Sequence, residues 1–231
     1  MSYKNVSIIL STYNESLDIE LTVKLIIKNL PDCEIVIVDD NSPDGTFEII
    51  KKINYPYLKI FCREKTKGLA SAFLLGLIES KGEIIGWIDT NMGFLSEKLP
   101  EMVKILSNYD MVVLSRYVKG GSDQRIYIRA FTSYMINLLS RFILGSTLKD
   151  YTSGMFLMKR SLLKTAIPIA YGHGEFFIEF LYKAFKKGNK ILEIPIVQPK
   201  DKMQVKSSFL DFVTIGFSYL IRIVYSRFRK D

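Results

Sequence analysis

The fold is decided by the stretch Glu34-Ile35-Val36-Ile37-Val38-Asp39-Asp40-Asn41-Ser42-Pro43-Asp44-Gly45. Its largely β-branched run, Glu34 to Val38, predicts a buried strand that stops at Asp39-Asp40. Turn-forming residues follow, and Asp44 can cap a helix that runs to Ile53. A short buried strand, a polar turn and a helix are the repeating unit of a parallel α/β sheet.

The same unit recurs through the first half of the chain. Short apolar runs with polar residues after them predict strands at Val6 to Leu10, Leu58 to Cys62, Ile84 to Ile88 and Met111 to Leu114. Helical spacing predicts helices at Leu17 to Leu30 and Leu69 to Ser80. We therefore predict an α/β fold with a mostly parallel sheet flanked by helices, in which ligands bind at the carboxyl ends of the strands.

The second half of the chain holds longer apolar helices. Helices are predicted at Ile126 to Leu144 and Glu175 to Lys187, and strands at Met155 to Met158 and Ile191 to Val197. A last helix, Ser208 to Arg229, combines several aromatic residues with basic residues at its end. We expect residues 1–207 to form one domain and residues 208–231 to form a C-terminal amphipathic helix.

Composition narrows the class of function. The 231 residues carry a formal net charge of +8, which suits nucleic acid, phosphorylated substrates or an anionic membrane face. A single histidine, His173, leaves little material for a zinc site or a Ser/His/Asp triad. The isolated Cys33 and Cys62 are expected to be free thiols. No G-x-G-x-x-G follows the first strand, which disfavours a nicotinamide-dependent oxidoreductase.

Acidic and amide side chains lie at the ends of two predicted strands. Asp89 and Asn91, two residues apart, can face one hard cation, because such ions prefer oxygen ligands. An ion there would neutralise a diphosphate leaving group. Asp39 and Asp40 can accept hydrogen bonds from a base or a ribose. Taken alone, Asp39 and Asp40 are better explained by a solvated turn with a helix cap, and an Asx-type turn is the alternative for Asp89 and Asn91.

Basic residues gather after the strand Met111 to Leu114. Arg116 follows that strand directly, and Arg125 and Arg129 lie one turn apart on the next helix. Arginine matches phosphate oxygens in bidentate geometry, although a solvated basic face is the alternative. Lys67 opens another helix, where an anion or an ordinary helix start fits equally.

Contact with a membrane is predicted without a spanning helix. No signal peptide is visible, and no run reaches about 18 uncharged apolar residues. We therefore expect a peripheral protein at the cytoplasmic face of a membrane. The helix Ile126 to Leu144 and the C-terminal helix have the pattern of interfacial helices, with ordinary core helices as the alternative.

Taken in order, six pieces of the sequence resemble family 2 glycosyltransferases, and within them the dolichyl-phosphate mannose synthase group. The resemblance extends over about residues 5–197. The six pieces are Ile9-Leu10-Ser11-Thr12-Tyr13-Asn14-Glu15, Ile35 to Thr46, Lys67-Gly68-Leu69-Ala70-Ser71-Ala72, Asp89-Thr90-Asn91, Ser115-Arg116-Tyr117-Val118-Lys119-Gly120-Gly121 and Asp150-Tyr151-Thr152-Ser153-Gly154.

The resemblance implies a GT-A fold, with a nucleotide-sugar half at about residues 1–118 and an acceptor half at about 119–207. It implies an inverting transfer of a hexose, with mannose from GDP-mannose as the first expectation, to a polyprenyl (dolichyl) phosphate. Asp89 and Asn91 would hold Mg or Mn, and Asp89, Arg116 and Arg129 would be catalytic. The donor nucleotide would be held by Thr12, Tyr13, Glu15, Asp39, Asp40 and Lys67. The acceptor phosphate would be held by Arg116, Arg129, Ser133, Lys200 and Lys202.

The sequence departs from the family pattern at three places. Asn91 stands where the family metal motif has a second Asp, and Gly93 replaces a polar residue that usually follows. Residues 200–207 replace an Arg-rich segment, so that Lys200, Lys202 or Lys206 would take over phosphate binding. These departures keep open a UDP-sugar-dependent enzyme and a catalytically impaired nucleotide-sugar-binding paralogue.

Two further expectations concern partners. A membrane-anchoring partner subunit would fit a protein that lies on a membrane surface without spanning it. A nucleic-acid partner is not expected, because it would explain the charge but not the acidic residues at three strand ends.

Overall fold

The computed structural model describes residues 2–145, 147–200 and 209–229, with the backbone alone described for 209–215. A seven-stranded sheet has the order β3-β2-β1-β4-β7-β5-β8, and β7 alone runs antiparallel to its neighbours. The mostly parallel α/β sheet predicted from the sequence is thereby confirmed. The strands are β1 (Val6–Thr12), β2 (Glu34–Asp39), β3 (Leu58–Cys62), β4 (Ile84–Ile88), β5 (Met111–Ser115), β7 (Met155–Lys159) and β8 (Ile191–Pro195).

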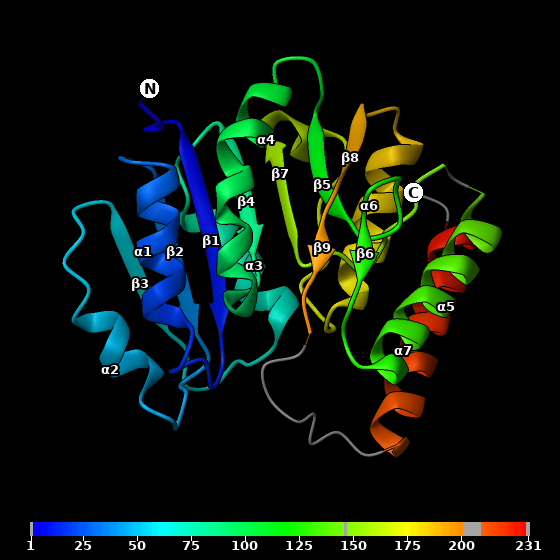
Figure 1. Cartoon of the computed structure of the whole chain (residues 1–231), viewed down its shortest axis with the longest axis horizontal. Coiled ribbons are helices and arrows are strands. Elements are labelled where there is room, and N and C mark those ends of the chain that lie inside the picture. Colours follow the sequence, from blue (N-terminus) through cyan, green and yellow to red (C-terminus); the bar gives the residue numbers. More distant parts are fainter. Residues whose placement is uncertain (1, 146, 201–208, 230–231) are drawn as a thin grey trace.

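Helices cover both faces of the sheet (Figure 1). A separate short ladder pairs β6 (Ser122–Asp123) with β9 (Val197–Gln198). The predicted helices of the second half lie within two residues of their expected ends. The helical elements are α1 (Ile19–Asn29), α2 (Thr46–Lys51), α3 (Leu69–Glu79), η1 (Thr90–Lys98), α4 (Leu99–Ile105), α5 (Tyr127–Leu144), η2 (Arg160–Lys164), α6 (Glu175–Lys186) and α7 (Phe209–Phe228).

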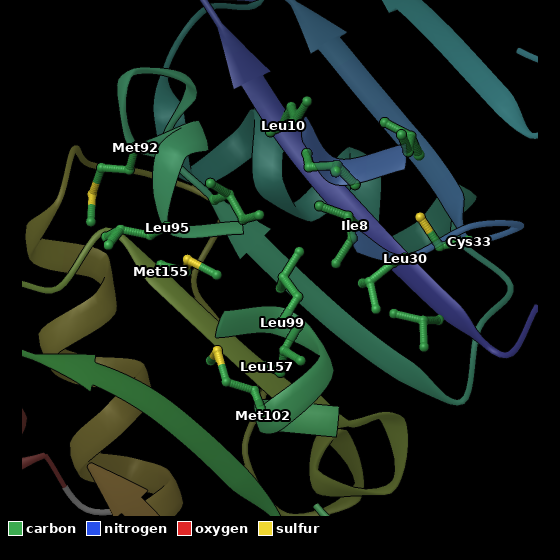
Figure 2. Close-up of a cluster of buried hydrophobic side chains, with 14 of the residues drawn as sticks. Ile8, Leu10, Leu30, Cys33, Met92, Leu95, Leu99, Met102, Met155 and Leu157 are labelled. Carbon is green, nitrogen blue, oxygen red and sulfur yellow. The ribbon is translucent and has the colours of Figure 1, made fainter. Parts of the chain in front are cut away.

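Two hydrophobic cores lie on opposite faces of the sheet. In the first, Leu95 of η1 and Leu99 and Met102 of α4 pack with Ile8 and Leu157 of the strands (Figure 2). The second core lies against α3, α5 and α6 and is rich in aromatic residues. Both faces of each central strand are buried, which explains why the strands read as continuous apolar runs rather than alternating ones.

The reversed strand β7 brings a polar turn to the ligand-binding edge. Because β7 is antiparallel to β4 and β5, the segment that enters it, Asp150–Gly154, lies where β4 and β5 end. Asp89 after β4 and Arg116 after β5 lie at the same edge. The backbone amide of Asp89 donates a hydrogen bond to the carbonyl oxygen of Gly154 at 2.9 Å.

Candidate active site

A small cavity of about 100 Å³ lies at this edge of the sheet. Four predicted site residues line it: Asp89, Asn91, Arg116 and Arg129. Arg125 of the segment before α5 and Thr152 of the turn before β7 complete the polar wall. The fold therefore brings the predicted metal residues and the predicted phosphate residues to one place, from three separate segments of the chain.

Asp89 is a partly buried carboxylate whose oxygens accept no hydrogen bond from the described residues. Burial raises its pKa to about 7, although the positive charge of Arg116 acts in the opposite direction. Burial, followed by repulsion from Asp89, likewise raises the pKa of Glu15 to about 7. A divalent cation bound here would favour the ionised form of both carboxyls.

The oxygen donors at this place fit a metal that is partly held by its substrate. Among the described residues, no group of three or more His, Cys, Asp or Glu side chains could hold a metal ion. Asp89 and the exposed Asn91 offer one carboxylate and one amide oxygen. Mg²⁺ binds in this manner, through one or two protein oxygens together with phosphate oxygens and water.

The packing of η1 explains why no polar side chain follows Asn91 two positions later. A Cβ at Gly93 would lie 2.1 Å from the Thr22 hydroxyl oxygen and 2.8 Å from the Thr22 Cα. That hydroxyl also donates to the carbonyl of Thr90 at 2.6 Å, which fixes α1 against the start of η1. Gly93 therefore permits close packing, and the third position of the family motif has no side chain here.

Arg116 is held by carboxylates rather than pointing into open solvent. Its Nε and Nη2 donate to the two oxygens of Asp150 at 2.9 and 2.8 Å, and Nη2 also donates to the Thr152 hydroxyl at 2.7 Å. The side chain of Arg116 is 4 % exposed and that of Asp150 is fully buried. Arg116 also lines the cavity, and its Nη1 makes a longer contact of 3.4 Å to Asp123.

Arg125 and Arg129 also line the cavity, and Ser133 bonds to Arg125. Arg125 makes a bidentate contact with Asp123 at 2.8 and 2.6 Å and donates to the Ser133 hydroxyl at 2.8 Å. Burial alone would raise the pKa of Asp123, but Arg125 and Arg116 outweigh it and lower that pKa. The Ser133 hydroxyl thus already binds an arginine, and the sequence-based set omitted Arg125, although its position beside Arg129 was apparent.

Asp39 and Asp40, which were predicted to bind nucleotide, are buried and accept hydrogen bonds from neighbouring segments of the chain. Asp39 is fully buried and accepts hydrogen bonds from Thr12 at 2.8 Å and from the amide and hydroxyl of Ser42 at 2.9 and 2.6 Å. Asp40 pairs with Arg63 and accepts the amide of Gly68 at 2.7 Å. Their direct contact with a nucleotide stays a prediction.

Tyr13 and Lys67 form the exposed part of the predicted nucleotide site. The Lys67 ammonium lies 5.0 Å from the centre of the Tyr13 ring, and the Tyr13 side chain is 50 % exposed. The aromatic face of Tyr13 can stack on the base of a nucleotide, and the Lys67 ammonium can bind the phosphates of that nucleotide. Lys200 is exposed just after β9, while Lys202 and Lys206 lie outside the described residues.

A second and larger cavity of about 620 Å³ shares Asp89 and residues 152–154 with the first. Its further walls come from Trp87 of β4, the start of α6 with His173 and Glu175, and Ser218 and Tyr219 of α7. The sequence-based set contains none of these side chains. The spacing Gly172-His173-Gly174-Glu175 before a helix was the available signal.

Large apolar side chains remain exposed on two neighbouring helices. Figure 1 shows α5 and α7 side by side at one end of the molecule, and α7 also packs on α6. The exposed apolar face comprises Tyr127, Phe131, Tyr134 and Phe142 of α5 with Phe217, Ile221 and Phe228 of α7. No helix among the described residues is both long and apolar enough to cross a membrane.

Similarity to known proteins extends over most of the chain. The model of glycosyl transferase family 2 matches residues 7–166. A glucosyl-3-phosphoglycerate synthase from Mycobacterium tuberculosis, solved with uridine diphosphate, superimposes with a TM-score of 0.72 at 17 % identity, over 98 % of this chain and 81 % of that one. A second structure of that enzyme, with Mn²⁺, uridine diphosphate and glucosyl-3-phosphoglycerate, gives a TM-score of 0.70 at 20 % identity, over 96 % and 79 % of the two chains.

Curated relatives of higher identity are named as mannosyltransferases. A dolichol-phosphate mannosyltransferase of Pyrococcus furiosus is 32 % identical over 199 residues, which are 82 % of this chain and 55 % of that protein. This chain therefore spans about half the length of that relative. An undecaprenyl-phosphate mannosyltransferase of Micrococcus luteus is 28 % identical over 198 residues, or 81 % of each chain.

Proposed function

This chain belongs to glycosyltransferase family 2, and from that premise we propose that it transfers one hexose from a nucleotide-sugar to a polyprenyl phosphate at a membrane surface. One observation carries the proposal: Asp89 lies between an arginine-walled cavity and a larger cavity beside α7. A phosphate acceptor suits the first cavity. The names of the relatives, dolichol-phosphate and undecaprenyl-phosphate mannosyltransferase, support the same class of acceptor.

The chemistry needs little from a general base. A phosphomonoester has a second pKa of about 6, so that much of it is dianionic at neutral pH and can attack an anomeric carbon directly. Arg125 and Arg129 in the cavity would bind the attacking phosphate, and Arg116 would act beside them. The residues thus overcome the repulsion between two anionic substrates and align them.

The departing nucleoside diphosphate is an anion, so that a cation bound beside it would stabilise it. Asp89 and Asn91 would hold Mg or Mn, which supplies positive charge to the departing diphosphate. On the protein side, Asp89 must lose its proton to bind the metal. GDP-mannose is the donor we propose first, with a UDP-sugar as the alternative that Tyr13 and Lys67 would accommodate equally.

A direct assay tests the transfer. The purified chain is incubated with Mn²⁺, dolichyl phosphate and either GDP-mannose or UDP-glucose, and the lipid fraction is analysed by mass spectrometry. We expect a polyprenyl-phosphate hexose with one donor, and none with Asp89→Ala. Nucleotide-sugar binding without lipid product in any combination would favour the catalytically impaired paralogue instead.

Membrane attachment through α5 and α7 is the second part of the proposal. Aromatic side chains on the exposed apolar face would insert at the headgroup boundary, and the exposed Arg141 would reach anionic lipids. Because α7 also binds α6 through Arg222 and Glu179 at 2.8 Å, this helix packs on the domain and faces outward at once. Peripheral attachment at the cytoplasmic face, with or without a membrane-anchoring partner subunit, stays a prediction.

Flotation with anionic liposomes tests the attachment. Phe142 of α5 is 86 % exposed. Leu17, which precedes α1 and is not part of the exposed apolar face, has a similar exposure of 78 %. We expect Phe142→Glu to reduce the floated fraction and the matched control Leu17→Glu to leave it unchanged. Equal flotation of both variants and the parent protein would reject this face as the attachment surface.

A further inference from the structure

Asn137 of α5 is a buried amide side chain that lies between this helix and the polar turn before β7. It is 2 % exposed, whereas Leu138, the next residue of the helix, is 42 % exposed. Its Oδ1 accepts the backbone amide of Tyr151 at 2.5 Å, and its Nδ2 donates to the Thr152 hydroxyl and to the Ser133 carbonyl, each at 2.8 Å. These partners fix the orientation of the amide group, because a backbone amide can only donate and a carbonyl can only accept.

The Thr152 hydroxyl is the point at which this contact reaches Arg116. Its oxygen accepts from Nδ2 of Asn137 at 2.8 Å and from Nη2 of Arg116 at 2.7 Å, which uses both of its acceptor positions. The same Nη2 also donates to Asp150 at 2.8 Å. Thr152 and Arg116 both line the arginine-walled cavity of about 100 Å³. A buried network of this kind holds each member in place through the next, so that Asn137 acts on the guanidinium through Thr152.

Asn137 also fixes the part of α5 that carries a second cavity arginine. Arg129 lines the cavity from the first turns of this helix. Ser133 lies one turn after Arg129, and Asn137 lies one turn after Ser133, to whose carbonyl it donates. The position of Arg129 relative to Asp89 across the cavity therefore depends on how α5 lies against the turn, and Asn137 provides directed bonds at that junction.

Packing alone does not explain an amide at this position. Asparagine within a helix is unfavourable by its own propensity. Ile136 and Leu144 of the same helix are buried in the second hydrophobic core, which shows that this side of α5 accommodates apolar side chains. A buried apolar group would need no hydrogen-bond partners, whereas the amide of Asn137 has partners in fixed directions. The amide therefore contributes orientation, which is the property that an arrangement of charged groups around a cavity needs.

We propose that Asn137 is a positioning residue of the transfer, which holds Arg116 and Arg129 opposite Asp89 for binding of the acceptor phosphate. The inference rests on the proposed function and adds a residue that is not among those lining the cavity. Its side-chain bonds go to α5 and to the turn, and none reaches the predicted nucleotide residues of the described chain. The acceptor should therefore depend on Asn137, and the nucleotide should not.

The test removes each end of the central hydrogen bond. Asn137→Ala and Thr152→Val delete one partner each, a double variant combines them, and Thr152→Ser keeps the hydroxyl as the conservative variant. Ser140→Ala is the matched control, because it deletes another buried polar group of α5, whose hydroxyl donates to the Ile136 carbonyl at 2.8 Å within the helix. Transfer to dolichyl phosphate in detergent gives kcat and the KM of each substrate. Calorimetry gives GDP and UDP affinity, and a thermal melt gives stability.

We expect Asn137→Ala and Thr152→Val each to raise the KM for dolichyl phosphate by about 10–100-fold, with the donor KM and the nucleoside diphosphate affinity unchanged. The double variant should show no more than the rise of the larger single variant, because both substitutions remove the same contact. Thr152→Ser and Ser140→Ala should remain close to the parent protein. If Asn137→Ala does not fold, a rise in Thr152→Val that is absent in Thr152→Ser sustains the inference, and equal values in the two overturn it.

Three results would overturn the inference while leaving the transfer itself intact. Rises that multiply in the double variant would show that Asn137 does not act through Thr152. A lower melting temperature with an unchanged KM for dolichyl phosphate would make Asn137 a residue of stability alone. An equal loss of nucleotide affinity would indicate a general distortion of the domain. If the parent protein forms no lipid product with either donor, the proposed function fails and this inference fails with it.

Discussion

Replacing Asp150 by Asn tests whether Arg116 is held in place as the structure describes. Asp150 is fully buried and accepts Nε and Nη2 of Arg116 as well as the Arg116 backbone amide at 3.0 Å. Asparagine removes the charge and turns an acceptor into a donor that faces the guanidinium. Breaking one partner of a buried ion pair costs about 3–5 kcal/mol.

The expected loss converts to a large change in melting temperature. For a chain of this size each kcal/mol lowers the melting temperature by about 2–4 °C, so that we expect Asp150→Asn to melt roughly 6–20 °C below the parent protein. Differential scanning calorimetry measures this directly. Glu101→Gln is the control, because its contact with Lys98 is 3.7 Å long and exposed, and such pairs contribute about 0–1 kcal/mol.

A second variant separates the charge from the packing. Arg116→Met combined with Asp150→Leu removes both charges and should recover most of the lost stability. A loss below about 1 kcal/mol in Asp150→Asn, which typical surface pairs show, would refute the buried pair. Arg116 would then be available to bind phosphate with its whole guanidinium group.

Three further outcomes follow from the site. The pKa of Asp89 is raised to about 7, so that its ionisation lowers the stability of the fold as the pH rises from about 4 towards 7. Because metal binding requires the ionised carboxylate, we expect calorimetry to give an Mn²⁺ affinity about tenfold higher at pH 8 than at pH 6. Asp89→Asn should abolish that pH dependence. Asn91→Asp should tighten Mn²⁺ binding and keep or raise transfer, whereas weaker binding would place Asn91 away from the ion. Gly93→Ala should lower stability by about 1–3 kcal/mol in urea unfolding, because its Cβ meets Thr22, and no loss would mean that η1 can shift.

The order of strands and helices could be predicted from the sequence because the signals are local. Runs such as Ile84 to Ile88 are buried on both faces, so that apolar residues are continuous and the strand ends at the first polar residue. The position of β7 could not be predicted in this way. Nothing in Met155 to Lys159 indicates that the strand runs backwards between β4 and β5, since pairing partners are set by the whole sheet.

The candidate site was predictable where each residue directly follows a strand. Asp89, Asn91, Arg116 and Arg129 line one cavity, as their positions after strands and on the next helix suggested. Trp87 and Tyr219 were not predictable, because an indole within a strand and a phenol within an amphipathic helix have the pattern of ordinary core residues. Their position beside a cavity depends on how α6 and α7 pack, and no local sequence pattern contains that information.

The place of β7 has a consequence for the newly synthesised chain. When the ribosome has released residues only as far as β5, one edge of β4 and both edges of β5 are unpaired, and residues 155–159 are the strand that later joins β4 to β5. Unpaired strand edges are templates for pairing with other chains. We expect products that stop before Met155 to aggregate during translation, and the first 118 residues to be unable to reach a stable state without the segment that completes the sheet.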